Sequence, residues 1–139
     1  ISTLELVKDS LAGKILIDVT VPLVPPKVGT VQMPPEGSAG KRAQDFLGEE
    51  VRVISAFQNI AAHLLQQDVT IECDVLVTGN DKESRQRVID MIGEAGMTGW
   101  HAGPIANAAA AESLTSILIQ INRSGGISHS GIRIIGQEH

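Results

Sequence analysis

The chain has 139 residues, of which 42% are hydrophobic and 19% are charged, so it is large enough for one domain or part of one. Its net charge is −5 and its eleven basic residues are scattered, which excludes general nucleic-acid binding because no basic stripe exists to neutralise phosphates. We expect neither a signal peptide nor a membrane span, and the single cysteine, Cys73, fits a reducing, cytoplasmic setting.

The first half of the chain predicts a helix end, a strand and a second helix, with a long loop between the last two. Residues 3–11 have the pattern of an amphipathic helix that ends there, and we expect the N-terminus to be truncated, processed or trimmed. The nearly continuous apolar run 15–19 predicts a strand covered on both faces. The loop 21–40 carries five of the six prolines, and Ser38 and Gly48 mark the ends of the next helix.

Strand and helix patterns alternate through the rest of the chain, which predicts an α/β sheet. The expected elements are a strand over 51–57, a short helix over 59–67, a strand over 73–81, a helix over 82–96, a strand over 97–101 and a long helix from 104 to 123. Asn80 or Asp81 is expected to cap the helix over 82–96. Pro104 is expected in the first turn of the last helix, where an amide would lack a helical partner anyway.

The last predicted helix has two unlike halves. Its first turns carry alanines, whose small side chains let a neighbouring helix or a flat ligand approach the backbone. After Glu112 an apolar stripe follows at helical spacing, formed by Leu114, Ile117, Leu118 and Ile121. A strand that leads through a Gly-Pro corner into a helix of small residues suits a planar cofactor. The alternative is a closely packed helix that binds no ligand.

No motif in the chain assembles a catalytic acid, base and nucleophile. The sequence has no GxGxxG loop between a strand and a helix, no Walker A motif, no CxxC and no GxSxG. Its four histidines lack metal-ligand spacing, Cys73 is expected to be inert, and Asp18 to cap the turn after its strand. With three aromatic residues in all, a bound ring would lie against aliphatic side chains and backbone. We therefore predict no metal site and no catalytic side chain.

Five segments, in order, carry a resemblance to a known family: IDVTVPLVPP, SAGKRAQDFLGEEVRVISAFQNIAAHLL, CDVLVTGNDKESRQRVIDMI, WHAGPIANAAAAESLTSILIQINR and SGIRI. Each is weak alone, but their order is specific, and together they extend from Leu11 to Ile135. The chain resembles the later part of the NADPH-dependent F420 reductases, also called coenzyme F420:NADP oxidoreductases. The resemblance implies an oxidoreductase that transfers a hydride between NADPH and the deazaflavin coenzyme F420.

Proteins of that family carry a Rossmann domain with a Gly-rich phosphate loop, followed by a small helical domain. The resemblance implies that residues 1–102 are the C-terminal part of a Rossmann-like α/β domain and that 103–139 form a helical cofactor-binding region. The Gly-rich half and the residues that read the NADP 2′-phosphate are missing from this sequence. We therefore expect the chain not to hold NADP by itself with normal affinity. Gln58 stands where a member of the family has histidine, so an imidazole role does not carry over to this position.

The resemblance also implies which residues surround the two cofactor rings. The cofactors supply the hydride chemistry, and the protein holds the rings at near-attack distance, roughly 3–3.5 Å, without a proton shuttle. The backbone around residues 59–62 would hold the nicotinamide carboxamide. By this resemblance the cofactor-binding residues are Pro22, Leu23 and Val24 beside the rings, Asn59, Ile60 and Ala62 at the nicotinamide, and Gly103, Pro104, Asn107, Ser130, Gly131 and Ile132 over the deazaflavin.

Two other hypotheses stay open. A related NADP-dependent reductase would act on another small acceptor, such as an imine or a metal chelate. A non-catalytic module would use the apolar helix around 114–121 for association alone. In each case we expect a homodimer, or a chain completed by the missing segment, because a strand over 15–19 without its sheet neighbours would present an open apolar edge.

Overall fold

The computed structural model describes residues 1–60, 64, 66–67 and 71–137. It contains a four-stranded sheet in the order β1–β2–β3–β4 with helices packed against it, so the predicted α/β fold is confirmed. The strands are β1 (Ile15–Asp18), β2 (Arg52–Ser55), β3 (Asp74–Gly79) and β4 (Thr98–His101). Each lies within a predicted strand, whereas the helix predicted over 59–67 falls largely outside the described residues.

The strands of the sheet run in two directions. β1 and β2 are parallel, with Ile17 opposite Ile54, and β3 and β4 are parallel, with Leu76 opposite Trp100. β2 and β3 are antiparallel, so the sheet is mixed and not wholly parallel. β1 and β2 therefore run toward β3 and β4 from the opposite direction, and the carboxyl ends of neighbouring strands meet: Asp18 lies opposite Ser55, and Ser55 lies opposite Thr78.

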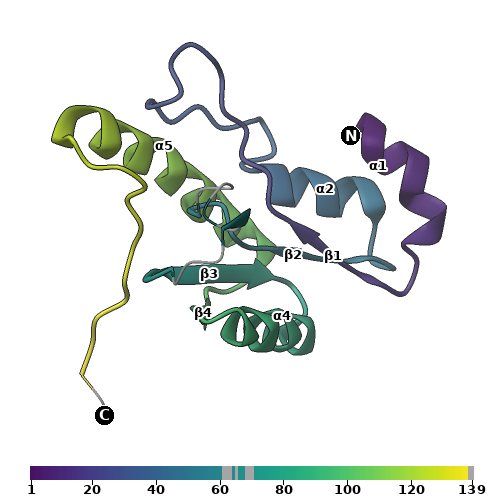
Figure 1. Ribbon diagram of the computed structural model, residues 1–139. Coiled ribbons are helices and arrows are strands. Elements are labelled where there is room, and N and C mark those ends of the chain that lie inside the picture. Colours follow the sequence, from purple (N-terminus) through teal and green to yellow (C-terminus); the bar gives the residue numbers. More distant parts are fainter. Residues whose placement is uncertain (61–63, 65, 68–70, 138–139) are drawn as a thin grey trace.

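Helices cover both faces of the sheet (Figure 1). α4 (Lys82–Glu94) packs on one face, and α2 (Ala39–Leu47) and α5 (Ala108–Gly125) pack on the other. α1 (Ser2–Val7) and the 3-10 turn η1 (Lys8–Ser10) lie on the β1 side. Pro104 precedes a second 3-10 turn, η2 (Ile105–Asn107), and so stands before α5 and not in its first turn. None of the helices in the described parts of the chain is long and apolar enough to cross a membrane.

Alternate residues of β2 enter two separate hydrophobic cores. Ile54 packs in the core beneath α4 with Val77 and Ile92, whereas Val53 packs in the core beneath α2 with Leu47. The alternation follows from the pleat, which directs successive side chains of a strand to opposite faces. Because full burial of such a side chain contributes about 1.5–3 kcal/mol, the two cores together fix where β2 ends and the following loop begins.

Side-chain caps place the helix starts where the sequence predicts them. Ser38 Oγ accepts a hydrogen bond of 2.9 Å from the amide of Lys41 at the start of α2. Asp81, the second of the two candidates, caps α4 by accepting from the amide three residues later, also at 2.9 Å. Asp18 accepts a 2.8 Å hydrogen bond from the Thr20 amide, so its predicted role as a turn cap is confirmed.

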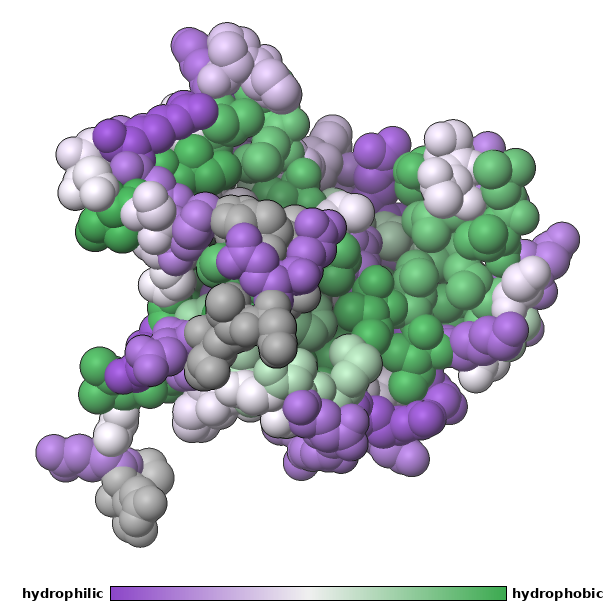
Figure 2. Space-filling view, viewed as in Figure 1, coloured by the Kyte–Doolittle hydropathy of each residue, from purple (hydrophilic) through white to green (hydrophobic). Residues whose placement is uncertain are grey.

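Two expectations about burial are wrong. All four residues of β1 are only half-buried, because β1 is the outermost strand of the described sheet. In the predicted stripe of α5, Ile117 and Ile121 are 48% and 40% exposed, and Leu118 alone is buried. The buried face of α5 is formed by small and polar residues, among them Ala108, Ala111, Glu112 and Ser116. Figure 2 shows further apolar surface over α1 and β1.

Small residues allow α2 and η2–α5 to approach each other closely, and one glycine tests this contact. A Cβ atom on Gly40 would lie 3.2 Å from Ile105 Cδ1, 3.3 Å from Ser55 Cβ and 3.4 Å from Ala108 Cβ. A Cβ atom on Gly93, near the end of α4, would meet nothing within 4 Å.

We expect Gly93→Ala to raise the free energy of unfolding by about 0.5–1 kcal/mol, because alanine is the better helix former. Gly40→Ala gains the same propensity but must displace three buried neighbours by a few tenths of an ångström, so it should lower the free energy of unfolding by about 1 kcal/mol. Urea denaturation of both variants measures the difference. Equal stabilisation by the two substitutions would show that α2 and α5 are not in close contact.

Candidate functional site

Two hollows lie at the carboxyl ends of the parallel strands β1 and β2. The first, here called the β1 cavity, has a volume of about 510 Å³ and lies between α1, the end of β1 and α2; its lining includes Asp18, Thr20, Val21, Pro22, Ala39 and Arg42. The second, here called the α5 pocket, has a volume of about 220 Å³; it is lined by Gln58, Asn59, Ile60, Thr115, Leu118, Ile119, Asn122, His129 and Ser130. In open α/β sheets, ligands bind outside the carboxyl ends of the strands, so the region beyond the ends of β1 and β2 is the candidate site.

Gln58 connects the two hollows. Its side chain is buried, and Nε2 donates hydrogen bonds of 2.9 Å to the Asp18 carbonyl oxygen and 2.7 Å to Ser55 Oγ. The backbone carbonyl oxygen of Gln58 accepts a 2.7 Å hydrogen bond from Thr115 Oγ1 on α5. Asp18 lines the β1 cavity, and Gln58 lines the α5 pocket. Gln58 therefore connects the ends of β1 and β2, through its side-chain amide, to α5, through its backbone carbonyl oxygen.

The loop that follows β2 begins with a strained residue. Phe57 has a φ of 69°, a left-handed conformation that is uncommon for residues other than glycine. Such a conformation costs on the order of 1–3 kcal/mol and persists only where neighbouring structure fixes it. The core beneath α4 holds Phe57, and the hydrogen bonds of Gln58 hold the next residue. The strain therefore marks a loop that directs Asn59 and Ile60 into the α5 pocket.

The α5 pocket combines an aliphatic surface with amide and hydroxyl edges. Ile60, Leu118 and Ile119 supply the aliphatic part. Asn59 Nδ2 donates to the Asp74 carbonyl oxygen at 2.9 Å, and the Ser130 amide donates to Asn122 Oδ1 at 3.0 Å. Among the lining residues, His129 is the one with a titratable side chain. The pocket can therefore hold a flat ring at its faces and edges, but its polar groups are not arranged as an acid–base pair.

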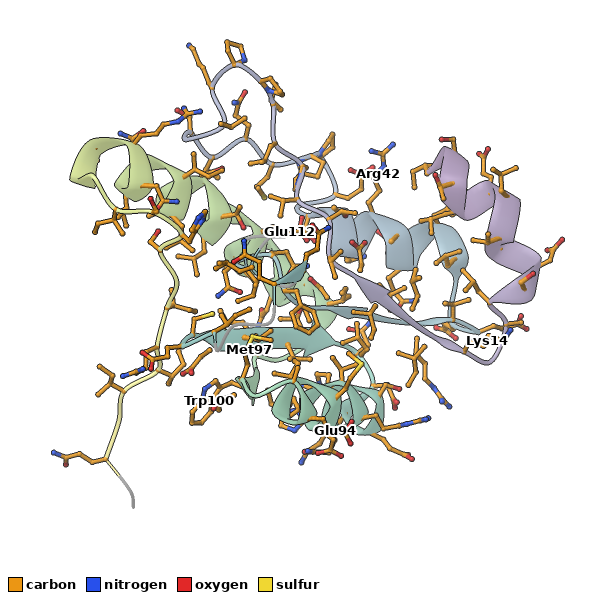
Figure 3. All side chains as sticks on the ribbon, in the orientation of Figure 1. Lys14, Arg42, Glu94, Met97, Trp100 and Glu112 are labelled. Atoms are coloured by element: carbon orange, nitrogen blue, oxygen red, sulfur yellow. The ribbon has the colours of Figure 1, made fainter. Side chains whose placement is uncertain are left out.

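A buried carboxylate on α5 fixes this helix to α2. Glu112 is fully buried, and its two oxygens accept hydrogen bonds from the amides of Ala39 at 2.6 Å and Gly40 at 3.1 Å (Figure 3). Burial raises the pKa of Glu112, and the hydrogen bonds from the α2 amides oppose that rise. Sequence reasoning missed this contact. The sequence offered one indication of it: α2 has no acidic residue in its first turn, so the free amides at its start need an acceptor from elsewhere in the chain.

The structure brings together some of the predicted cofactor-binding residues. Asn59, Ile60 and Ser130 line the α5 pocket, and Pro22 lines the β1 cavity on the other side of Gln58. The other predicted residues on these segments lie elsewhere: Leu23 and Val24 continue the loop beyond Pro22 and line neither hollow, and Ala62 falls outside the described residues.

Gly103, Pro104 and Asn107 lie between β4 and the start of α5. The Gly103 carbonyl oxygen accepts a 3.0 Å hydrogen bond from the amide of Gly79, the last residue of β3, and Asn107 Nδ2 donates to the Ala102 carbonyl oxygen at 2.8 Å. None of the three residues lines either hollow. Sequence reasoning missed the residues of α5 that do line the pocket: Thr115, Leu118, Ile119 and Asn122.

Gly131 and Ile132 pass the start of β3. The Ile132 carbonyl oxygen accepts from the Asp74 amide at 2.8 Å, and a Cβ atom on Gly131 would lie 2.7 Å from Cys73 Cβ, so only glycine fits there. Burial, and next to it the charge of Asp74, raises the pKa of the Cys73 thiol. A raised pKa keeps the thiol protonated and a poor nucleophile, as expected of an inert cysteine.

The residues present fit a ring but not a whole dinucleotide. A pocket of about 220 Å³ is smaller than those that enclose drug-sized ligands, and its aliphatic and amide lining matches a flat ring with a polar edge. The chain has no Gly-rich loop that would hold a pyrophosphate at a helix start. Within the described residues, no group of three or more His, Cys, Asp or Glu side chains is placed to hold a metal ion.

Comparisons with known proteins agree with the resemblance seen in the sequence. The chain is 34% identical over 143 residues to the F420-dependent NADP reductase of Methanocaldococcus jannaschii, and this match covers 99% of the chain and 64% of the relative. It is 34% identical over 140 residues to the protein of that name from Methanothermobacter marburgensis, covering 96% of the chain and 62% of the relative. No protein-family model matches the chain.

Solved structures give the same result. A crystal structure from Arthrobacter sp. FB24, provisionally named an F420-dependent NADP reductase, superposes with a TM-score of 0.77 at 25% identity, covering 93% of this chain and 60% of the other. A hypothetical protein from Sinorhizobium meliloti, at 18% identity and a TM-score of 0.60, shares the fold alone. The predicted resemblance to the F420-dependent NADP reductases is therefore confirmed, and the chain spans about three fifths of the length of the relatives it matches.

The contact between Glu112 and α2 makes a prediction about stability. Glu112→Ala leaves two amides at the start of α2 without their acceptors and opens a cavity in a packed contact. We expect it to lower the free energy of unfolding by about 2–4 kcal/mol, measured by urea denaturation. The control is Glu94→Ala at the exposed end of α4, which should change stability by less than about 0.5 kcal/mol. A similar small effect at Glu112 would contradict the assignment.

The raised pKa of Glu112 adds a pH dependence with a defined sign. In the unfolded chain the group titrates near 4.5, and in the folded chain it titrates higher, so the folded state binds the extra proton between the two values. Its contribution to stability is therefore greatest at low pH and falls as the pH rises through that window. Glu112→Gln should lack this dependence. Unfolding measured from pH 4 to 8 tests the difference, and parallel curves for the two proteins would disprove it.

Proposed function

We propose that this chain is the ring-binding part of an oxidoreductase that transfers a hydride between NADPH and the deazaflavin coenzyme F420. The observation that carries the proposal is the pair of hollows on either side of Gln58, at the carboxyl ends of β1 and β2. The names of the curated relatives, F420-dependent NADP reductase, supply the two coenzymes and favour a deazaflavin over an imine or a metal chelate as the acceptor.

In this proposal the residues of the chain bind and align the rings and take no part in proton transfer. The coenzymes supply the hydride chemistry when they are bound. Ile60, Leu118 and Ile119 would contact the face of a ring in the α5 pocket, and Asn59 and Asn122 would meet its polar edge. Pro22 would contact the second ring from the β1 cavity. The site thus acts by holding two flat groups together and excluding water.

The division of the chain follows from the same proposal. Residues 1–102 would belong to a Rossmann-type domain, and residues 103–139 would close one side of the site with α5 and the segment after it. β1 is the outermost described strand, so further strands of such a sheet would continue beyond it. The Gly-rich phosphate loop would come from that continuation. The chain by itself is therefore expected to bind F420 more readily than NADP.

Titration with F420, followed by its fluorescence, tests the proposal on this chain, and Thr115→Val probes the pocket. The substitution keeps the shape of the side chain but removes the hydroxyl that holds the Gln58 carbonyl oxygen. We expect saturable binding to the wild-type chain and a dissociation constant raised about 3–10-fold by Thr115→Val. Ser124→Ala, which removes an exposed hydroxyl on the same helix, should bind like the wild type.

The outcomes separate the rival functions. No saturable binding of F420 to the wild-type chain would reject the proposal and favour an association module. For the chain completed by its phosphate-binding segment, NADPH should bleach the absorbance of F420, whereas turnover of an imine or a metal chelate in preference to F420 would assign a related reductase.

We further propose that the protein forms a homodimer in the cytoplasm. The outer edge of β1 and the exposed Val19 next to it form an apolar surface that another chain can cover, as can the exposed Ile117 and Ile121 of α5. Light scattering should give a mass near twice the 14.7 kDa of one chain. A mass of 14.7 kDa would reject the dimer for this chain without bearing on the coenzymes it binds.

A further inference from the structure

Asp74, the first residue of β3, is bonded to two segments that line the α5 pocket. Its carbonyl oxygen accepts from Asn59 Nδ2 at 2.9 Å, on the loop that follows β2. Its amide donates to the Ile132 carbonyl oxygen at 2.8 Å, and its Oδ2 accepts from the Ile134 amide at 2.7 Å. The same Oδ2 accepts from Trp100 Nε1 of β4 at 3.0 Å. Asp74 itself is only 8% exposed, so its acceptor atoms are largely shielded from water.

The segment 130–134, here called the tail segment, belongs to no helix or strand, yet it is fixed at both of its ends. At its start Ser130 donates from its amide to Asn122 Oδ1 at 3.0 Å and from its hydroxyl to the Leu118 carbonyl oxygen at 3.2 Å. At its other end the carboxylate of Asp74 holds Ile134, whose side chain is 45% exposed. Figure 3 shows Trp100 on the side of the sheet where this part of the chain passes.

We infer that Asp74 is a positioning residue that holds the tail segment in place as one wall of the α5 pocket, and so sets the affinity of the pocket for a ring. The claim about affinity for a ring, the second half of this inference, rests on the proposed function. The claim that Asp74 holds the tail segment, the first half, does not, because it concerns where Ser130 lies in the free protein. Asp74 touches neither hollow and acts only through Asn59 and the tail segment.

The carboxylate is the part of Asp74 that matters for the tail segment. One oxygen accepts from two N–H groups, and hydrogen bonds to an ionised acceptor are roughly twice as strong as neutral ones. Asp74→Ala removes the acceptor, whereas Asp74→Asn keeps its size and leaves at best two weaker bonds. Both variants keep the backbone hydrogen bonds of residue 74 to Asn59 and Ile132. The two variants therefore differ chiefly in how strongly they hold the Ile134 amide.

Amide hydrogen exchange of the free protein, read by NMR, tests the first half. In Asp74→Ala the Ile134 amide should exchange at least about tenfold faster, because it loses a charged acceptor. The Ser130 amide, whose own acceptor Asn122 is untouched, should exchange at least about threefold faster because the tail segment is released. The exchange rates in Asp74→Asn should fall between those of the wild type and Asp74→Ala. Asp90→Ala, at an exposed position of α4, should change the exchange of neither amide. An unchanged Ser130 amide in Asp74→Ala would overturn the inference.

A backbone variant removes the same bond from the other side. Ile134→Pro deletes the N–H donor and leaves Asp74 intact, and Ile134→Ala is its matched control because it keeps the donor. We expect Ile134→Pro to speed Ser130 exchange as Asp74→Ala does, and Ile134→Ala to match the wild type. If Asp74→Ala proves unfolded, this pair decides the inference alone: equal Ser130 exchange in the two variants would reject it.

Titration with F420 then tests the second half. Asp74→Ala and Ile134→Pro should raise the dissociation constant at least about threefold, while Ile134→Ala and Asp90→Ala bind like the wild type. Equal binding by all of them would overturn the claim that Asp74 sets affinity. If F420 binds none of the proteins, including the wild type, the proposed function fails, and Ser130 exchange still decides whether Asp74 positions the tail segment.

Discussion

The site depends most on the buried carboxylate of Glu112 at the amino terminus of α2. The two groups are 73 residues apart in sequence, yet the contact satisfies the free amides of α2 and a carboxylate that burial would otherwise penalise. The partial positive charge of a helix start favours an anion there. One turn later on the same face of α5, Thr115 holds the Gln58 carbonyl oxygen. Two neighbouring side chains therefore fix α5 both to α2 and to the loop that follows β2.

The length of α5 decides which part of the helix reaches the site. Ile105 and Ala108 pack with Val53 in the core beneath α2, and the α5 pocket lies farther along the helix. From Ala108 to Ile119 the helix advances by about 16 Å at 1.5 Å per residue. Gly103 and Pro104 consequently lie before the start of this helix, whereas residues 115–122 line the pocket. Of the two uses that the sequence leaves open for the small residues of α5, the structure shows close packing against another helix, α2.

Local signals in the sequence were enough to predict the four strands and several of the caps that bound the helices. Ser38 and Asp81 cap helices, Gly48 ends one, and Asp18 caps a turn, because each of these contacts is made within a few residues. The relation between distant elements was not predictable in this way. No periodicity indicates that β3 runs against β2, that Glu112 reaches Ala39, or that Ile117 stays exposed. Asn59, Ile60 and Ser130 were placed in one site by the family resemblance, and the α5 residues beside them were not.

Several polar groups around the α5 pocket help to hold its walls. Asn59 bonds to Asp74, Ser130 to Asn122, and Gln58 to the ends of β1 and β2. Gln58 is a neutral amide at the junction of the two hollows, and the carboxylate of Asp18, at the end of β1, bonds to Thr20 in the turn. A charged side chain at this buried junction would have to be desolvated and would place a fixed charge between the two proposed ring sites. A neutral, hydrogen-bonded junction avoids both costs, which suits the proposed transfer, in which the two coenzymes carry the chemistry and the protein supplies position alone.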